Sequence, residues 1–324
     1  AGMIELRQAI CDRTKADYGL EYEATQAVVA SGAKHMVYIA LAALVDPGDE
    51  VIVPAPYWVS YYEMVRLFGG VPVVVNVSEE QGFQLTPEQL EQAITDKTKA
   101  IILNNPSNPT GAVYPKEALK AVADVCVKHD LYIISDEIYD KLVYDGVPFT
   151  SVAALSDEIK AHTILINGVS KTYAMTGWRL GYACGPAPII KIMTKIHQSA
   201  IMSAPTTSQY AAITALKDCD GEIERMRNEY NMRRRLVVKS FNDMGLSCFE
   251  PRGAFYAFPC IKSSGMTSEE FCTKLLEQKH VAIIPGNAFG ASGEGYARVS
   301  YAYSVEHLME ALRRIREFLS ENVK

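Results

Sequence analysis

Hydrophobic and polar positions divide the first half of the chain into short apolar runs separated by helical stretches. The apolar runs are rich in β-branched residues and predict strands at 27–31, 50–55, 71–75, 99–105, 131–137 and 163–168. The stretches between them predict helices at 34–44, 57–68 and 116–129. Strands that alternate with helices predict an α/β fold with a mostly parallel central sheet, and unbroken apolar runs predict that its middle strands are buried on both faces.

The pattern changes in the last third of the chain. A long, highly charged helix is predicted at about 221–244, followed by shorter strands and a last helix at 304–322. This order is typical of a smaller α+β domain joined through a connecting helix. We therefore predict a large domain at 1–228 and a small C-terminal domain at 229–324, and a length of 324 residues agrees with two domains.

Composition and charge narrow the class of protein. The chain has 48% apolar and 22% charged residues, as a globular protein does, and its net charge of −6 argues against a nucleic-acid partner. No apolar run reaches the roughly 18–20 residues of a membrane span, so no membrane partner is expected. The seven cysteines are scattered, odd in number and without the spacing of metal ligands, so we expect reduced thiols, no metal site and a cytoplasmic protein.

Candidate functional residues follow the predicted strands, where a parallel α/β sheet binds its ligands. Small residues at 31–35 open a helix and suit an anion, although alone they are more typical of an ordinary helix start. Trp58 follows the second strand and, taken alone, is most simply a core residue. Asn108 lies in the loop NPSNPTG, where prolines and a glycine impose a tight turn, and it is either a turn residue or a donor to a ligand oxygen.

Two ionisable residues follow the next strands. Asp136 ends an apolar strand, where a carboxylate needs a cationic partner such as a protonated pyridine nitrogen. Lys171 lies in a Gly/Ser-rich turn, where partial burial would lower its pKa and favour bonding to an aldehyde, although an isolated lysine is usually a surface residue. A lysine, an acid, an amide donor and an anion-binding loop are together what pyridoxal 5′-phosphate (PLP) needs.

The motifs NPSNPTG, SDEIYD and SKTYAMTGWRLGY resemble those of the aspartate aminotransferase superfamily, class I of the PLP fold type I enzymes. The resemblance runs from AGMIELRQAI to ARVSYA and the final helix, and so covers essentially the whole chain. DPGDEVIVPAPYWVSYYEMV, NPTGAVYPKE and AMTGWRLGYACGP are similar to the bacterial-type aspartate aminotransferases, a subgroup that includes plastid aspartate/prephenate aminotransferases. The resemblance implies a large domain with a mostly parallel sheet, PLP as cofactor and a homodimer.

The resemblance also implies roles for single residues. Lys171 matches the lysine that bonds the cofactor aldehyde and moves the substrate proton, and Asp136 matches the carboxylate that keeps the pyridine nitrogen protonated. Asn108 and Tyr139 would hold the phenolic oxygen, and Trp58 would stack on the ring. The phosphate would be bound by residues of the first helix start and of the lysine loop, namely Gly32, Ala33, Lys34, Ser170 and Arg179.

Substrate binding is implied for Lys34, Trp58, Asn108 and Arg298. Arg298, in YARVSYA, matches the arginine that binds the α-carboxylate, and Lys34 matches a lysine implicated across the dimer interface in recognising the distal carboxylate. We therefore expect a dicarboxylic donor, aspartate first with glutamate as co-substrate, and 2-oxoglutarate or prephenate as acceptor. The neighbouring Tyr256 is expected to be a packing residue.

The chain departs from the family pattern at its start. Family members have a further N-terminal segment of several dozen residues, with a substrate-contacting glycine region and a tyrosine that reaches the partner's phosphate, and this sequence has neither. An incomplete site is therefore expected, and a plastid form with its transit peptide removed stays open. Other functions also stay open: a PLP-dependent C–S β-lyase, another class I specificity, or a non-catalytic PLP-binding module.

Overall fold

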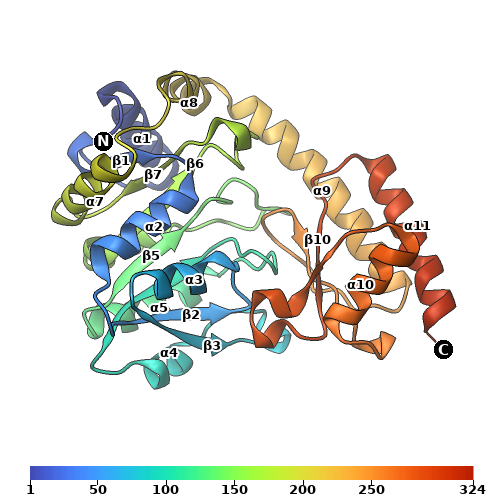
Figure 1. Cartoon of the computed structure of the whole chain (residues 1–324). Helices are drawn as coiled ribbons and strands as arrows, with labels where there is room; N and C mark the ends of the chain where they lie inside the picture. Colours follow the sequence, from blue (N-terminus) through green and yellow to red (C-terminus); the bar gives the residue numbers. More distant parts are fainter. Residues whose placement is uncertain (324) are drawn as a thin grey trace.

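A computed structural model describes residues 1–323, and its centre is a seven-stranded sheet in the order β1–β7–β6–β5–β4–β2–β3 (Figure 1). Strands β2 to β6 pair in parallel, whereas β7 runs antiparallel to both β6 and β1. This confirms the predicted α/β fold with a mostly parallel sheet. The strands are β1 (Ala27–Ala30), β2 (Glu50–Ala55), β3 (Val71–Asn76), β4 (Thr98–Asn104), β5 (Tyr132–Asp136), β6 (Thr163–Gly168) and β7 (Gly181–Cys184).

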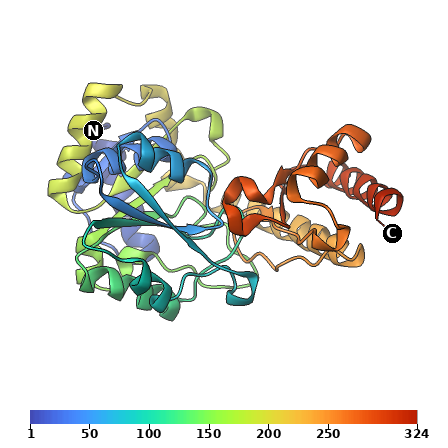
Figure 2. The same cartoon turned by 60° about the horizontal axis from the view of Figure 1, so that its bottom comes forward.

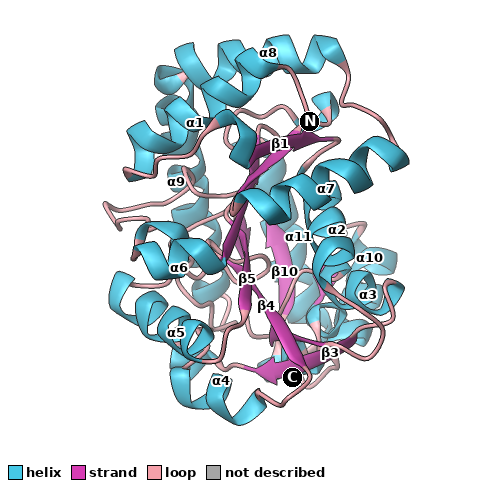
Figure 3. Cartoon of the chain, turned by 90° about the vertical axis from the view of Figure 1, so that its left-hand side faces the viewer, coloured by secondary structure: helices cyan, strands magenta, loops and turns pink. Residues whose placement is uncertain are grey.

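Helices cover both faces of the sheet, as Figure 3 shows. One face packs against α2 (Ala33–Leu44), α3 (Ser60–Leu67) and α7 (Ala187–Ala200). The other face packs against α1 (Ile4–Tyr18), α4 (Pro87–Ala93), α5 (Lys116–Lys128), α6 (Asp157–His162) and α8 (Thr206–Asp218). Among the described residues, no helix has the length and apolar character of a membrane span.

Successive residues of the central strands point to opposite faces, which explains the two-sided packing. Ile102 of β4 and Ile134 of β5 belong to the core beneath α2, whereas Ile101 and Ile133 belong to the core beneath α5. All four side chains are at most 2% exposed. A strand buried on both faces needs an unbroken apolar run, and that run is the pattern from which these two strands are predicted.

A smaller group of elements is joined to the sheet through the 24-residue helix α9 (Asp220–Asp243), which runs between the two parts in Figures 1 and 2. This group has its own apolar core, which includes phenylalanines from α9, α10 and α11. The boundary near residue 228, inside α9, stays a prediction. The remaining elements are β8 (Tyr256–Ala257), α10 (Ser268–Lys279), β9 (Ile284–Pro285), β10 (Ala297–Ser300) and α11 (Val305–Asn322), with the three strands in the order β8–β10–β9.

Two local differences from the predicted elements bear on the site. Helix α3 begins at Ser60 and not at residue 57, because the Tyr57 N–H donates to the carbonyl of Phe289 (2.9 Å) and so is tied to the smaller group. Strand β7 was not predicted, because Gly-Tyr-Ala-Cys lacks the β-branched run that indicates a strand. Only its pairing with β1 and β6 makes it a strand.

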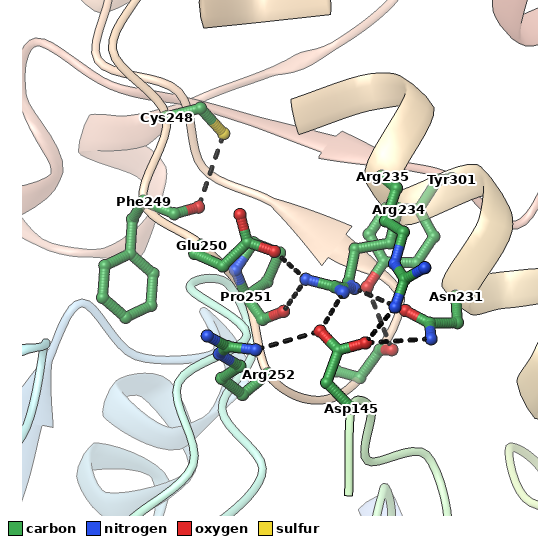
Figure 4. Close-up of polar contacts among 11 residues, drawn as sticks. Asp145, Asn231, Arg234, Arg235, Cys248, Phe249, Glu250, Pro251, Arg252 and Tyr301 are labelled. Atoms are coloured by element: carbon green, nitrogen blue, oxygen red, sulfur yellow. Dashed lines mark hydrogen bonds and ion pairs between the residues drawn. The ribbon is translucent and has the colours of Figure 1, made fainter. Parts of the chain in front are cut away.

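A network of charges joins the loop after β5 to the smaller group of elements (Figure 4). Asp145 in that loop accepts hydrogen bonds from Arg234, Arg235 and Arg252. Asn231 donates to the same carboxylate at 3.2 Å. Arg234 is 1% exposed, so its buried positive charge needs the Asp145 carboxylate to offset the cost of leaving water. The hydrogen bond from Arg235 is the main cause that lowers the pKa of Asp145 to about 2.

Loss of the Asp145 carboxylate should destabilise the protein, because the buried Arg234 then keeps Glu250 as its one carboxylate partner. We expect Asp145→Ala to lower the free energy of unfolding by about 3 kcal/mol, as measured by urea denaturation at pH 7. The matched control is Glu317→Ala, which removes a carboxylate from an exposed pair with Arg313 and should cost less than about 1 kcal/mol.

The effect should also depend on pH with a definite sign. The folded-state pKa of Asp145 is lowered from 3.8 to about 2, so its stabilisation is present above pH 4 and is lost as the pH falls toward 2. The difference between the parent and Asp145→Ala should shrink over that range. Equal destabilisation by Asp145→Ala and Glu317→Ala at pH 7 would contradict this account.

Candidate active site

The carboxyl ends of the parallel strands meet at one edge of the sheet, and a cavity of about 400 Å³ lies there. The end of β5, the loops after β1, β2, β4 and β6, and β10 of the smaller group all contribute side chains. Ten of the eleven predicted site residues line this cavity: Ala33, Lys34, Trp58, Asn108, Asp136, Tyr139, Ser170, Lys171, Arg179 and Arg298. The eleventh, Gly32, lies directly beside the cavity at the start of α2.

Asp136, the last residue of β5, is 4% exposed. Its Oδ2 accepts a hydrogen bond from the Tyr61 hydroxyl (2.5 Å), and its Oδ1 accepts one from the Ile138 N–H (3.3 Å). Burial raises the pKa of Asp136 to about 6, against the effect of these hydrogen bonds and of Lys171. The cavity thus contains a buried carboxylate that a cationic group of a ligand would stabilise.

Lys171 lies in the loop after β6 and is partly buried. Burial is the main cause that lowers the pKa of its amine, and repulsion from Arg179 and Arg298 lowers it further, whereas Asp136 raises it. A lowered pKa increases the fraction of neutral amine, which is the form that attacks a carbonyl carbon. The arrangement therefore favours the neutral form of the Lys171 amine.

The N-terminus of α2 presents groups that suit an anion. The first N–H groups of a helix are free to bind an anion, and Ala33 begins this helix. A Cβ at Gly32, which has a φ of +92°, would lie 2.6 Å from Nη2 of Arg179, so glycine is needed for the guanidinium to lie against the helix. A Cβ at Gly181 would lie 2.2 Å from the Ala33 nitrogen. The N–H groups at the start of α2, the guanidinium of Arg179 and the hydroxyl of Ser170 could therefore donate together to one phosphate.

A second guanidinium enters the cavity from β10. Arg298 Nη1 donates to Asn108 Oδ1 at 3.0 Å. Its Cζ lies 4.5 Å from the ring centroid of Tyr256 and 4.9 Å from that of Phe289. The buried Nε has no hydrogen-bond partner among residues 1–323. A guanidinium that lines the cavity and is held by aromatic rings is suited to binding a carboxylate.

Hydrogen bonds also fix the two predicted partners of the phenolic oxygen. The Asn108 N–H donates to Asn104 Oδ1 at 2.8 Å. The hydroxyls of Tyr139 and Tyr256 lie 3.0 Å apart and share a hydrogen bond. Burial raises the pKa of Tyr139 well above its ordinary value, so its hydroxyl stays protonated and able to donate.

Trp58 and Lys34 form one wall of the cavity. The indole of Trp58 meets the ring of Tyr61 edge to face, with centroids 5.3 Å apart. Lys34 Nζ lies 4.9 Å from the centroid of the Trp58 ring, within the cavity of its own chain. The wall thus combines a flat aromatic surface with a positive charge.

Sequence reasoning missed Tyr61 and gave an incomplete interpretation of Tyr256. Tyr61 lines the cavity and donates to Asp136. Tyr256 packs against Tyr139, as expected, but it also lines the cavity. One signal was available for Tyr61: it lies three residues after Trp58, so a helical turn that places Trp58 at the site places Tyr61 beside it.

Amino-group transfer between carboxylic acids needs a nucleophilic amine, a base that moves a proton, and cationic groups that hold anions. The fold and the cavity together define an enzyme of this class. The chain belongs to the aminotransferase class I and II family, whose sequence model matches residues 1–315. The family is PLP-dependent, and the chain is an aminotransferase similar to aspartate aminotransferases.

Known relatives match nearly the whole chain. An aspartate aminotransferase of Geobacillus stearothermophilus is 46% identical over 324 residues, which are 98% of this chain and 82% of the relative. The crystal structure of an aromatic aminotransferase from Pyrococcus horikoshii superposes with a TM-score of 0.96 at 45% identity and covers 99% of this chain and 86% of its own. The structure of the aspartate aminotransferase of Thermus thermophilus with maleate has a TM-score of 0.94 at 42% identity. The match covers 98% of this chain and 82% of that one.

The lowered pKa of Lys171 predicts that its amine is acetylated at lower pH than the amine of an exposed lysine. Trace acetic anhydride labelling of the cofactor-free protein across pH 6–11, followed by peptide mass spectrometry, should give a midpoint for Lys171 below the ordinary value of 10.5. Arg298→Gln should raise this midpoint, because it removes a repelling charge, and Asp136→Asn should lower it, because it removes an attracting one. The exposed Lys97 serves as internal control, and one midpoint common to all three proteins would contradict the electrostatic account.

Proposed function

We propose that the chain is a PLP-dependent aminotransferase for dicarboxylic amino acids, with aspartate as donor, glutamate as co-substrate and 2-oxoglutarate or prephenate as acceptor. One observation carries the proposal: Lys171 and Asp136 line one cavity together with two guanidinium groups, of Arg179 and Arg298, that come from different elements. One guanidinium suits a phosphate and the other a carboxylate. The aspartate aminotransferases among the relatives support aspartate as donor.

The residues present fit the cofactor. The buried Asp136 needs a positive partner, and a protonated pyridine nitrogen is one. The space that only a glycine leaves at Gly32 allows Arg179 and the start of α2 to hold a phosphate together. Asn108 and Tyr139 provide donors for the phenolic oxygen, and Trp58 provides a flat ring for stacking.

When bound, PLP supplies an aldehyde carbon that receives the amino group and a ring that withdraws electrons. Lys171 Nζ, kept partly neutral by burial and by the two arginines, would take the proton from the substrate Cα as general base and, as general acid, would give it to the carbon that came from the cofactor aldehyde. Asp136, ionised above its pKa of about 6, holds a positive charge at the ring nitrogen. Arg298 binds the α-carboxylate and so fixes the direction of the Cα–H bond.

Recognition of the second carboxylate is assigned to Lys34. Its ammonium lies against the Trp58 ring in the cavity, where a distal carboxylate would replace a weak cation–π contact with an ion pair. A donor with an uncharged side chain would leave Lys34 without this gain. The resemblance to bacterial-type enzymes implies a lysine that reaches across a dimer interface. The proposal therefore includes binding by Lys34 in the chain's own site or in that of a second copy.

We also propose a homodimer in the cytoplasm. Three large apolar side chains are exposed in the region of α7 and α8, namely Ile201 (47%), Met202 (75%) and Tyr210 (61%), and a second copy would cover them. All seven cysteines have free thiols, and five of them are buried, which supports a reducing compartment. Trp178, which precedes the cavity residue Arg179, is also exposed, so an interface that covered Trp178 would reach the edge of the cavity.

The proposal predicts a spectral change when the PLP-loaded protein meets its donor. We expect stepwise addition of L-aspartate to replace the absorbance band of PLP by that of pyridoxamine phosphate, and 2-oxoglutarate to restore it. Lys171→Ala should abolish the conversion within the time of the experiment, because the proton then has no carrier. A band that is indifferent to aspartate and glutamate but responds to another amino acid would contradict the assignment of Lys34.

Two controls separate the alternatives. Lys34→Ala should raise the aspartate concentration for half conversion by roughly tenfold or more, as expected for loss of a charged hydrogen bond, and should leave that for alanine unchanged. Pyruvate and ammonia formed from cysteine-like donors, without exchange of amino groups, would indicate the C–S β-lyase. A PLP band that no amino donor changes would indicate a non-catalytic binding module.

A further inference from the structure

Within residues 1–323 the Asp136 carboxylate accepts one hydrogen bond from a side chain, and the donor is Tyr61 of α3. The distance of 2.5 Å is that of a strong hydrogen bond to a charged acceptor. The second hydrogen bond, from the Ile138 N–H, is longer at 3.3 Å. Both residues of the Tyr61–Asp136 pair are at most 4% exposed, so water does not replace the phenol.

Core packing explains the ring of Tyr61 but not its hydroxyl. The ring belongs to the core beneath α2, α3 and α7 and meets Trp58 edge to face. A phenylalanine would fill the same space and would avoid the cost of burying a hydroxyl. The role of the hydroxyl must therefore concern Asp136, the residue to which it donates.

We propose that Tyr61 is a positioning residue of the aminotransferase reaction, whose hydroxyl orients the Asp136 carboxylate and keeps it ionised for the pyridine nitrogen of the cofactor. The inference rests on the proposed function, because it concerns the partner of that nitrogen. Trp58, which lies just before α3, and Tyr61, in the first turn of α3, both line the cavity, so one short segment supplies the stacking wall and the support of the carboxylate. A change in this segment would thus affect both the stacking of the cofactor ring and the carboxylate that binds its nitrogen.

The charge on Asp136 depends on few neighbours. The titratable groups that bear on it are Tyr61 from α3, Tyr139 from the turn after β5 and Lys171 from the loop after β6. The other charged side chains of the cavity are Lys34, Arg179 and Arg298.

Burial raises the pKa of Tyr61 well above its ordinary value, so the phenol stays a donor at every pH used below. Burial also raises the pKa of Asp136, and the Tyr61 hydrogen bond is the first cause that opposes the rise.

The test is the pH dependence of PLP binding to the full chain freed of cofactor. In the parent, affinity should fall as the pH drops through about 6, where Asp136 gains a proton and loses its attraction for the ring nitrogen. Tyr61→Phe should move this fall to higher pH by about one unit, because loss of the hydrogen bond should raise the proton affinity of Asp136 about tenfold. The phosphate of PLP also titrates near pH 6, but it does so equally in every variant.

A matched control exists outside the cavity. Tyr18 donates to Oδ2 of Asp140, a second buried carboxylate in the same turn after β5. Tyr18→Phe therefore removes the same kind of hydrogen bond and should leave the pH dependence of PLP binding unchanged. Thermal unfolding of both variants shows whether either substitution acts through stability.

A double-mutant cycle isolates the pair. In an Asp136→Asn background there is no charge to support, so adding Tyr61→Phe should change the PLP affinity by less than about twofold. Equal pH midpoints for the parent and Tyr61→Phe, or an equal loss of affinity in both backgrounds, would overturn the inference and leave the proposed function intact. A parent chain that binds no PLP at any pH would overturn the proposed function and this inference with it.

Discussion

The buried carboxylate of Asp136 is the constraint on which the rest of the site depends. Burial without a cation costs a carboxylate several kcal/mol, and it shows in a pKa raised to about 6. The chain offsets part of this cost with hydrogen bonds from Tyr61 and Ile138 and leaves the remainder for a ligand. A site built in this way discriminates in favour of ligands that bring a positive charge to that point.

The fold brings the other groups to this carboxylate without long-range distortion. Parallel strands end at one edge, so loops that are 30 or more residues apart in sequence, such as those of Asn108 and Lys171, line one cavity. Arg298 belongs to the smaller group of elements and reaches the cavity because the chain pairs across the junction: the Ala254 N–H donates to the Leu142 carbonyl at 2.9 Å. The charge network around Asp145 lies at the same junction and stabilises it.

The sequence allowed the fold class and strands β1 to β6 to be predicted, because these depend on local pattern. The residues expected at the site follow from the family resemblance, and their roles stay predictions. An unbroken apolar run predicts β4 and β5, and motifs around Lys171 and Asp136 resemble a known family. Strand β7 could not be predicted in this way, because its identity depends on pairing with β1 and β6. The hydrogen bond of Tyr61 joins residues 75 positions apart, and such a contact leaves no mark in a local pattern.

The central claim is that Lys171 is the amine that bonds the aldehyde of PLP at the carboxylate of Asp136. The most direct measurement is reduction of the PLP-treated full chain with sodium borohydride, followed by proteolysis and mass spectrometry of the peptides. The account predicts one stable pyridoxyl group, on the peptide that contains Lys171. A pyridoxyl group on Lys34 or on another lysine, with Lys171 unmodified, would contradict it.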